Sequence, residues 1–471
     1  MVFSSTVFLF LFLPIVLGVN FILKKSLRNT FILLSSLFFY AWGENILVLL
    51  MMGSICVNYV IGILISHAQK EPSKNLSTYV LSVGVILNLS VLIYYKYIHF
   101  IFENLFLLGV DLNVDISGVT LPIGVSFFTF QNISYLIDVY RKEVKSQSNL
   151  IHLGLYISLF PQLIAGPIVR YTDIFKEIKN RVVTKDIFKE GIIRFIRGLA
   201  KKVIIANSSG LIADKIFEIA PEDLSTPVAW LGAICYSLQI YFDFSGYSDM
   251  AIGLGKMLGF NFKENFNYPY ISTSVQEFWR RWHISLSTWF RDYLYIPLGG
   301  NRKGKYRTYL NLLIVFFITG LWHGASWNFV VWGLYHGFFL LIERIVPYKL
   351  PKLLIPIKRF YLILVVVIGW VLFRAENLTV GVEYIVKMFS FSKGSDYSPL
   401  IYLNNYVYFV LLLGLLFSTP LRKILYLNLH KIAKYEKQRN YLVYGFYLAL
   451  FIYTITELAQ ATYNPFIYFR F

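Results

Sequence analysis

The feature that most limits the fold of this chain is a series of apolar segments, each close to the length of a membrane-spanning helix. A helix needs roughly 20 apolar residues to cross the hydrocarbon core of a bilayer, and 18 is near the lower limit. The segments that reach or approach this length are Val2–Leu23, Phe31–Ser66 (with an expected interruption at Gly43–Asn45), Leu76–Leu108, Val228–Ile252, Tyr309–Trp322, Phe360–Phe373, Tyr402–Phe417 and Tyr441–Leu458. Together with shorter candidates they predict an all-α polytopic membrane protein with about a dozen transmembrane or re-entrant helices. Hydrophobic residues are 57% of the 471 and charged residues 15%, which excludes an ordinary soluble domain.

The distribution of basic residues predicts the orientation of these segments. No basic residue precedes the first one, whereas Lys24, Lys25 and Arg28 follow it, so we interpret it as a retained span and not a cleaved signal peptide. Short loops rich in Lys and Arg stay on the cytoplasmic side, which places the N-terminus outside. By the same rule the basic region 141–202 lies inside and the acidic Pro221–Asp223 outside.

The formal net charge of +18 is spread over loops between apolar segments. Membrane lipids with anionic headgroups are therefore the expected partner, and nucleic acid is not expected, because no basic patch is interleaved with aromatic residues. Cys56 and Cys235 both lie in apolar segments and form no CxxC pair. We expect both to be buried as small apolar residues.

Three of the seven histidines lie among tryptophans between Gln276 and Gly337. They are His283, His323 and His336, in a stretch flanked by apolar segments. A charged group at membrane depth costs roughly 2.5–3.5 kcal/mol on insertion scales, so ionisable residues there are functional candidates. Their spacing does not match HExxH and no cysteine accompanies them, so no metal site is expected.

The residues around His283 predict an amphipathic helix. Ser274 and Glu277 fit a capping box at its start, and Pro297–Asn301 carries the residues that end it. On one continuous helix, a single face would hold Trp279, Trp282, His283, Leu286, Phe290 and Tyr293. Arg281 would lie on another face, where it could meet headgroups or a phosphate-bearing donor.

Taken alone, a histidine on an apolar face is more often a core residue than a catalyst. His323 lies close to Gly320 and Gly324, which permit close approach of a helix or ligand. His336 follows it by thirteen residues, so on one continuous helix the two would be about 220° apart and could not share a face. The tryptophans are explained by membrane packing and interfacial anchoring.

Four motifs resemble one known family. They are Ser237–Asp249 (SLQIYFDFSGYSD), Phe278–His283 (FWRRWH), Trp322–Gly324 (WHG) and the C-terminal YNPFIYFRF that begins at Tyr463. They closely resemble the membrane-bound O-acyltransferase family, in its branch of bacterial polysaccharide O-acetyltransferases. The resemblance extends over nearly the whole chain and implies one membrane domain, 1–471, with a C-terminal aromatic tail, 463–471.

The resemblance implies that His323 is the essential catalytic residue and that His283 lies close to it. Imidazole titrates near neutrality, so it can take the proton of an attacking hydroxyl and return it to a departing thiol. The residues expected to bind substrate are Trp322, Trp282, Asp243, Gln239 and Arg281. For Asp243 and its neighbours in the apolar segment, structural hydrogen bonds from Arg, Tyr or His and the orientation of a histidine both remain open.

Two segments with helix-breaking residues recur in the same branch. Leu121–Val125 and Leu159–Pro167 contain prolines and glycines at membrane depth. Irregular backbone is tolerated there where it is buried in protein or lines a cavity, so we interpret both as walls of an internal channel. A proline-kinked span is the open alternative.

The aromatic C-terminus has two interpretations. It is either an interfacial aromatic belt or, as a resemblance to the small peptide of the D-alanyl transferase system implies, an acyl relay. In the second case Tyr468 is the third catalytic residue, because it matches the tyrosine thought to carry the acyl group.

The resemblance implies a multi-pass enzyme of the bacterial cytoplasmic membrane. It would move an acyl group, expected to be acetyl, from a cytoplasmic thioester such as acetyl-CoA to hydroxyls of alginate, peptidoglycan or another envelope glycan. No bound cofactor is expected, and a secreted or anchored acetyltransferase-like protein would complete the transfer. The alternatives are D-alanyl transfer to teichoic acid and a transporter or flippase, although no internal repeat of the transporter kind is visible.

Overall fold

The computed structural model describes residues 1–71, 74–346, 354–391, 398–421, 436–460 and 463–467. Within these ranges the chain is helical and contains no strand, which confirms the all-α prediction. The residues form two compact units, one of 1–195 with 250–263 and one of 196–249 with 264–471.

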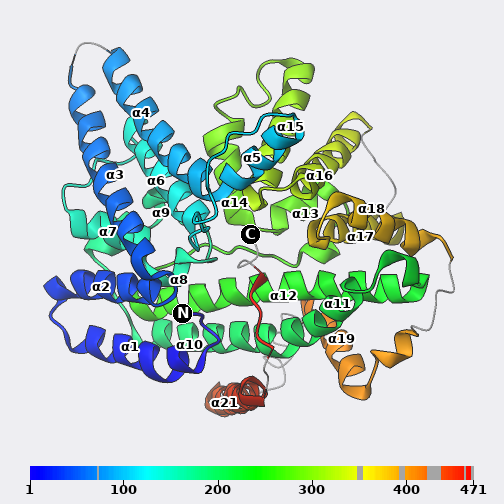
Figure 1. The fold of residues 1–471 in the computed structure, drawn as a ribbon. Coiled ribbons are helices and arrows are strands. Elements are labelled where there is room, and N and C mark those ends of the chain that lie inside the picture. Colours follow the sequence, from blue (N-terminus) through cyan, green and yellow to red (C-terminus); the bar gives the residue numbers. More distant parts are fainter. Residues whose placement is uncertain (72–73, 347–353, 392–397, 422–435, 461–462, 468–471) are drawn as a thin grey trace. The chain divides into compact units, whose positions relative to one another are not determined.

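The first unit is built on the N-terminal helices. Their bounds are η1 Phe8–Phe12, α1 Leu13–Ile22, α2 Lys25–Glu44, η2 Asn45–Leu47, α3 Val48–Ala68, α4 Lys74–Leu92, η3 Ile93–Tyr97, α5 Ile98–Leu107, α6 Val125–Tyr140, α7 Leu150–Ser158, α8 Phe160–Leu163, α9 Tyr171–Lys179 and α10 Lys185–Ala200. Helices α3, α4 and α6 pack side by side in this unit (Figure 1). The predicted interruption near Gly43–Asn45 is confirmed, because Asn45 has a φ of 47° and ends α2.

The second unit holds all three candidate histidines. Its helices are η4 Lys201–Ala206, α11 Asn207–Phe217, η5 Pro221–Asp223, α12 Thr226–Leu258, η6 Pro269–Ile271, α13 Val275–Arg281, α14 Ile284–Phe290, η7 Arg291–Tyr295, α15 Gly304–His323, α16 Trp327–Ile345, α17 Ile355–Arg374, α18 Leu378–Phe389, η9 Pro399–Ile401, α19 Asn405–Phe417 and α21 Glu436–Gln460. Residues 196–200 at the end of α10 belong to the second unit, and residues 250–258 at the end of α12 belong to the first unit.

Four helical stretches in the described part of the chain are long and apolar enough to cross a membrane. They are Lys25–Ala68, Asn75–Leu107, Ile355–Arg374 and Asn440–Gln460, which correspond to four of the predicted segments. The helices at Phe8–Ile22 and Asn405–Phe417 are apolar but shorter. The segments predicted at Val228–Ile252 and Tyr309–Trp322 are helical and lie in α12 and α15. Neither of these helices is among the four that are both long and apolar enough to cross a membrane.

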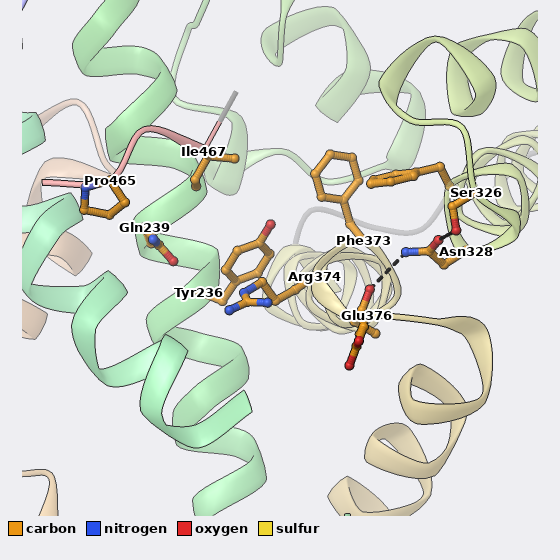
Figure 2. Close-up of a pocket in the computed structure, with 11 residues that line it drawn as sticks. Tyr236, Gln239, Ser326, Asn328, Phe373, Arg374, Glu376, Pro465 and Ile467 are labelled. Atoms are coloured by element: carbon orange, nitrogen blue, oxygen red, sulfur yellow. Dashed lines mark hydrogen bonds between the residues drawn. The ribbon is translucent and has the colours of Figure 1, made fainter. Parts of the chain in front are cut away.

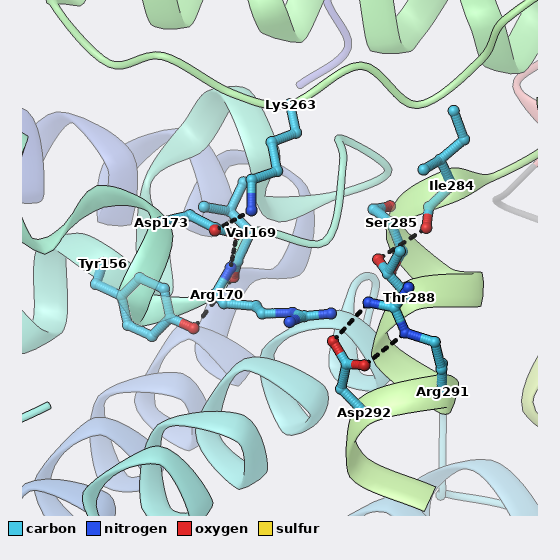
Figure 3. Close-up of polar contacts among 10 residues, drawn as sticks. All are labelled: Tyr156, Val169, Arg170, Asp173, Lys263, Ile284, Ser285, Thr288, Arg291 and Asp292. Carbon is cyan, nitrogen blue, oxygen red and sulfur yellow. Dashed lines mark hydrogen bonds and ion pairs between the residues drawn. The ribbon is translucent and has the colours of Figure 1, made fainter. Parts of the chain in front are cut away.

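Both segments predicted to break helices do so. Gly124 has a φ of 78° and precedes α6, and Leu159 separates α7 from the four-residue α8. A Cβ atom on Gly124 would lie 2.8 Å from the carbonyl oxygen of Leu163, so the two breaks are packed against each other. The non-helical backbone that follows the second break is held by α7, since the Tyr156 hydroxyl donates to the carbonyl of Val169 at 3.1 Å (Figure 3). That these breaks line a channel stays a prediction.

One cysteine differs from the expectation. Cys235 is buried in α12, as predicted, but Cys56 is exposed on α3. The prediction was wrong for Cys56 because an apolar helix in a membrane protein can turn small residues toward lipid as well as toward protein.

Helices α15 and α16 form a hairpin of unusually close approach (Figure 1). A Cβ atom on Gly320 would lie 2.3 Å from the carbonyl oxygen of Phe329, and one on Gly333 would lie 2.3 Å from that of Phe316. Only glycine fits at these two positions, so the predicted role of Gly320 in close approach is confirmed. His323 and His336 do not lie on one continuous helix, because the chain turns at Gly324–Ser326 between α15 and α16. Their angular separation along a single helix therefore does not apply.

Candidate active site

Two carboxylates hold the start of α13, the helix that leads to His283. Ser274 Oγ accepts from the backbone N–H of Glu277 at 3.0 Å, as the capping box predicts. The Glu277 carboxylate accepts from the backbone N–H of Thr273 at 2.9 Å, one residue earlier than in a standard box. Glu343, near the end of α16, accepts from the N–H groups of Val275 and Gln276 at 2.6 and 3.0 Å. Together these contacts satisfy the free N–H groups of α13 and fix it against α16.

The helix predicted to continue through His283 is interrupted there, so the prediction of one continuous face was wrong. Trp282 is extended and His283 has a φ of 42° and a ψ of 54°, which is the left-handed region. The physical reason is Asn265, which lies in the non-helical segment before η6. Its carbonyl oxygen accepts from Ile284 N–H at 3.0 Å and its side-chain oxygen from Ser285 N–H at 3.1 Å. These contacts replace the helical hydrogen bonds of the first turn of α14.

After this break, α14 continues as a regular turn of helix. The hydroxyl of Thr288 donates to the carbonyls of Ile284 and Ser285 at 2.8 and 3.0 Å (Figure 3). Arg291 forms a side-chain ion pair with Asp292, with Nε 2.6 Å from Oδ1 (Figure 3). The helix ends in turns after Tyr295, close to the breaker residues that the sequence indicated.

His323 is the last residue of α15 and is enclosed by aromatic rings. Its ring centroid lies 4.9 Å from that of Trp322, 5.0 Å from Trp332 and 5.2 Å from Phe373. Only 4% of its surface is exposed. A Cβ atom on Gly324 would lie 2.2 Å from the ring of Phe329, so the glycine after His323 is also required by packing.

Trp322 is the ring that the two predicted catalytic histidines share. Its centroid lies 6.0 Å from that of His283 and 4.9 Å from that of His323. The two histidines therefore belong to one cluster, although α14 and α15 are separate elements. Trp282, the other tryptophan predicted to bind substrate, is 3% exposed and packs on Trp370 with a centroid distance of 4.8 Å.

His336 also belongs to this cluster, through a second shared tryptophan. The Trp332 centroid lies 5.0 Å from that of His323 and 5.2 Å from that of His336. His336 is fully buried, and Trp279 packs edge-on against it at 5.2 Å. The argument that the two histidines could not share a face applies to one continuous helix; they lie on two helices instead, and the hairpin brings both to one aromatic cluster.

A cavity of about 190 Å³ adjoins this cluster (Figure 2). Phe373, which touches the His323 ring, is part of its wall. The full lining is Tyr236, Gln239, Ser326, Asn328, Phe329, Phe373, Arg374, Ala375, Glu376, Pro465 and Ile467.

The C-terminal segment Tyr463–Ile467 reaches this cavity and is held by an ion pair from the same unit. Lys202 Nζ lies 2.7 Å from Asp243 Oδ1, and both side chains are at least 95% buried. Lys202 also donates to the carbonyl of Pro465, and Asp243 Oδ2 accepts from the N–H of Ile467 at 2.9 Å. Asp243 thus has a structural partner, which agrees with the first of its two interpretations. The partner is a lysine and not the Arg, Tyr or His that was expected.

Further contacts hold the same segment. The Tyr463 hydroxyl donates to Asp214, which pairs with Arg374 at 2.6 Å. Phe466 is 5% exposed, and its ring stacks on that of Tyr247 with centroids 4.7 Å apart. An interfacial aromatic belt is therefore the wrong description of Phe466. Tyr468 lies outside the described residues.

Residues 37–382 match the family model of the membrane-bound O-acyltransferases. The chain belongs to this family. It is 42% identical to the probable alginate O-acetylase of Pseudomonas putida over the full length of both proteins. It is 38% identical to the peptidoglycan O-acetyltransferase of Helicobacter pylori, over 80% of this chain and 78% of that protein. The teichoic acid D-alanyltransferase of Bacillus subtilis is 31% identical, over 46% of this chain and 57% of that protein.

The family and the apolar helices identify this acyltransferase as a membrane protein and an enzyme. The prediction of an acyltransferase is confirmed, and the transporter alternative is set aside. In the described part of the chain, no group of three or more His, Cys, Asp or Glu side chains is placed to hold a metal ion.

Two predicted residues make contacts other than those expected. Arg281 pairs with Glu277 at 2.9 Å and donates to the carbonyl of Asn267 at 3.1 Å, so its guanidinium braces the loop before α13. Gln239 lines the cavity, and its side-chain oxygen is buried without a hydrogen-bond partner among the described residues. The role of either residue in the acyltransferase reaction stays a prediction.

Sequence reasoning missed Asn265 and Lys202. Lys202 had a usable signal, because a carboxylate such as Asp243 in an apolar helix requires a nearby cation. Asn265 had none, since its partners His283 and Ser285 lie 18 and 20 residues later and the contact depends on an unpredicted turn.

Proposed function

We propose that this enzyme transfers an acetyl group from a cytoplasmic acyl thioester to hydroxyls of a cell-envelope polysaccharide. The observation that carries the proposal is His323 of the WHG motif, which ends α15 inside an aromatic cluster beside a cavity. The 42% identity to a probable alginate O-acetylase, which extends over the full length of both proteins, supports a polysaccharide as the acceptor. The identity to a peptidoglycan O-acetyltransferase supports acetyl as the transferred group.

In this proposal His323 is the general base. As the attacking hydroxyl adds to the thioester carbonyl, its proton moves to the imidazole, and the departing thiolate takes that proton when the carbon–sulfur bond breaks. The last turn of a helix favours a cation, so the end of α15 stabilises the imidazolium that forms. The enclosing rings of Trp322, Trp332 and Phe373 keep water from competing with the acceptor.

The C-terminal tail is proposed to carry the acetyl group between donor and acceptor. Tyr468 directly follows Ile467, whose N–H is held by Asp243 and whose side chain lines the cavity. The phenol would attack the thioester, with its proton passing to His323 and the thiol leaving. The resulting aryl ester is more reactive than an alkyl ester, which suits an intermediate that must be passed on.

The membrane arrangement follows from charge and length. We propose one membrane domain over 1–471 in the bacterial cytoplasmic membrane, with about a dozen spanning or re-entrant helices. Four candidate spans support a multi-pass arrangement. The acceptor lies outside, and the longest polar stretches of this sequence, Arg170–Lys189 and Arg422–Asn440, are too short to form a domain that holds a polysaccharide. A secreted or anchored acetyltransferase-like partner is therefore proposed to complete the transfer.

Acetyl transfer is favoured over D-alanyl transfer by the share of this chain that each relative matches. The D-alanyltransferase of Bacillus subtilis matches less than half of this chain, whereas the O-acetylase matches all of it.

The test is acetyl transfer by the purified enzyme in liposomes. With acetyl-CoA labelled in the acetyl group, we expect label on the protein and, after addition of the partner and polymer, label on the polymer. Label on polymer from a D-alanyl donor, with none from acetyl-CoA, would contradict the proposal.

A further inference from the structure

Asn265 makes an unusually complete set of contacts around His283. It is fully buried, and its side-chain oxygen accepts from Ser285 N–H at 3.1 Å and from Ser285 Oγ at 2.8 Å. The same oxygen lies 3.3 Å from Nδ1 of His283. Its amide nitrogen donates to Ser248 Oγ at 3.1 Å. Both polar atoms of the Asn265 side chain are therefore used.

These contacts determine which atom of the amide faces His283. A backbone N–H can only donate, so the Asn265 atom that receives Ser285 N–H is the oxygen. The Ser285 hydroxyl spends its single proton on the same oxygen and presents only lone pairs to Nδ1, 3.4 Å away. Both polar neighbours of Nδ1 are thus acceptors.

A nitrogen that faces two acceptors carries the proton in the neutral imidazole. His283 is therefore protonated at Nδ1, and its Nε2 is left with a lone pair. Nε2 is buried and has no hydrogen-bond partner among the described residues. Neutral His283 can accept a proton or a hydrogen bond at Nε2, but it cannot donate one there to a developing oxyanion.

The same residue also holds the unusual backbone at this position. A left-handed conformation costs a residue with a Cβ atom on the order of 1–2 kcal/mol. The Asn265 carbonyl and side-chain oxygens satisfy the N–H groups of Ile284 and Ser285, which this conformation separates from α13. One residue thus sets the position, ring orientation and tautomer of His283.

We propose that Asn265 is a positioning residue that keeps His283 as the Nδ1–H tautomer, with Nε2 presented as an acceptor to the reacting groups. This inference rests on the proposed role of His283 in acyl transfer. It assigns His283 to proton acceptance or hydrogen-bond acceptance and excludes it as an oxyanion donor. Removing the partner that orients a metal-bound histidine changes activity by about 10–100-fold, and we expect an effect of that order for Asn265.

The experiment combines activity with a direct reading of the tautomer. Asn265→Leu keeps the approximate shape and removes the acceptor, whereas Asn265→Asp keeps an acceptor oxygen. Ser248→Ala is the matched control, because it removes only the partner of the amide nitrogen. We expect Asn265→Leu to lower kcat about 10–100-fold with little change in donor KM. Asn265→Asp and Ser248→Ala should stay within about tenfold of the original enzyme.

The tautomer is read by ¹⁵N NMR of histidine-labelled full-length enzyme in lipid nanodiscs, with the His283 signals assigned by their loss in His283→Gln. The original enzyme and Asn265→Asp should show a protonated Nδ1 and a bare Nε2. A protonated Nε2 in the original enzyme overturns the inference, even if Asn265→Leu fails to fold. So does a folded Asn265→Leu with unchanged kcat. The NMR reading does not depend on acetyl transfer, so a failure of the proposed function is recognised separately, by an enzyme that transfers no acetyl group.

Discussion

Lys202 and Asp243 form an ion pair of 2.7 Å within the second unit, and each of them also binds the backbone of the C-terminal tail. Their side chains are 4% and 2% exposed, so neither charge is solvated by water. The pair therefore has two functions, charge neutralisation and binding of the tail, which mutations can distinguish. Each residue neutralises the other, and together they hold Pro465 and Ile467.

Loss of one partner is expected to destabilise the enzyme. Lys202→Met leaves Asp243 charged and buried, which costs about 3–5 kcal/mol of folding free energy in comparable pairs. The measurement is the temperature of half-unfolding in detergent, compared with the original enzyme. An unchanged temperature would contradict the burial of this pair.

Two double variants separate stability from tail anchoring. In Lys202→Met/Asp243→Asn an amide oxygen still accepts from the N–H of Ile467, whereas in Lys202→Met/Asp243→Leu nothing does. Both remove the buried charges and should restore stability relative to Lys202→Met. We expect about 10²-fold lower acetyl transfer for the Leu variant than for the Asn variant, because misplacement near 1 Å can cost that much. Equal activity in two folded double variants would show that the tail contact does not matter.

His323→Ala is expected to abolish polymer acetylation, with a loss of about 10²–10⁴-fold from the missing base. The measurement is acetyl content of the polymer from cells with equal enzyme abundance in the membrane. His67→Ala is the control, because His67 is exposed at the end of α3. Appreciable acetylation by a well-expressed His323→Ala enzyme would remove His323 from the mechanism.

His336 is expected to act through packing. His336→Phe keeps a ring against Trp279 and Trp332 and should keep activity within about tenfold. His336→Ala removes a fully buried ring and should lower stability by about 3 kcal/mol. His283→Ala also removes a fully buried ring and should lower stability as well. The informative comparison is therefore His283→Phe, which should impair transfer, whereas His336→Phe should keep it. Loss of transfer in a stable His336→Phe enzyme would instead place His336 in the reaction.

Tyr468→Phe tests the acyl relay, since it removes only the hydroxyl from the side chain. We expect polymer acetylation to stop while hydrolysis or binding of the thioester donor continues. The label from acetyl-CoA should also disappear from the purified protein. Normal acetylation by this variant would mean that the tail serves only as an anchor.

Local chemistry was enough to predict several parts of the fold. Helix-breaking residues placed the interruptions at Gly43–Asn45 and Leu159–Pro167, and Ser274 began α13 as its side chain requires. The glycine near His323 predicted the close approach of two helices, which Gly320 provides. Each of these depends on residues within a few positions of one another, so the sequence carries the information directly.

The apolar segments and the local motifs thus determined the helical class, many helix ends and the residues that form the cluster. Tertiary structure alone decided how those residues meet. Asn265 breaks the helix at His283 against its periodicity, and the α15–α16 hairpin places His323 and His336 on one tryptophan. Asp243 holds Ile467 across 224 residues of chain. Periodicity describes only neighbours along a helix, whereas these contacts arise because buried polar groups must find partners wherever the fold brings them.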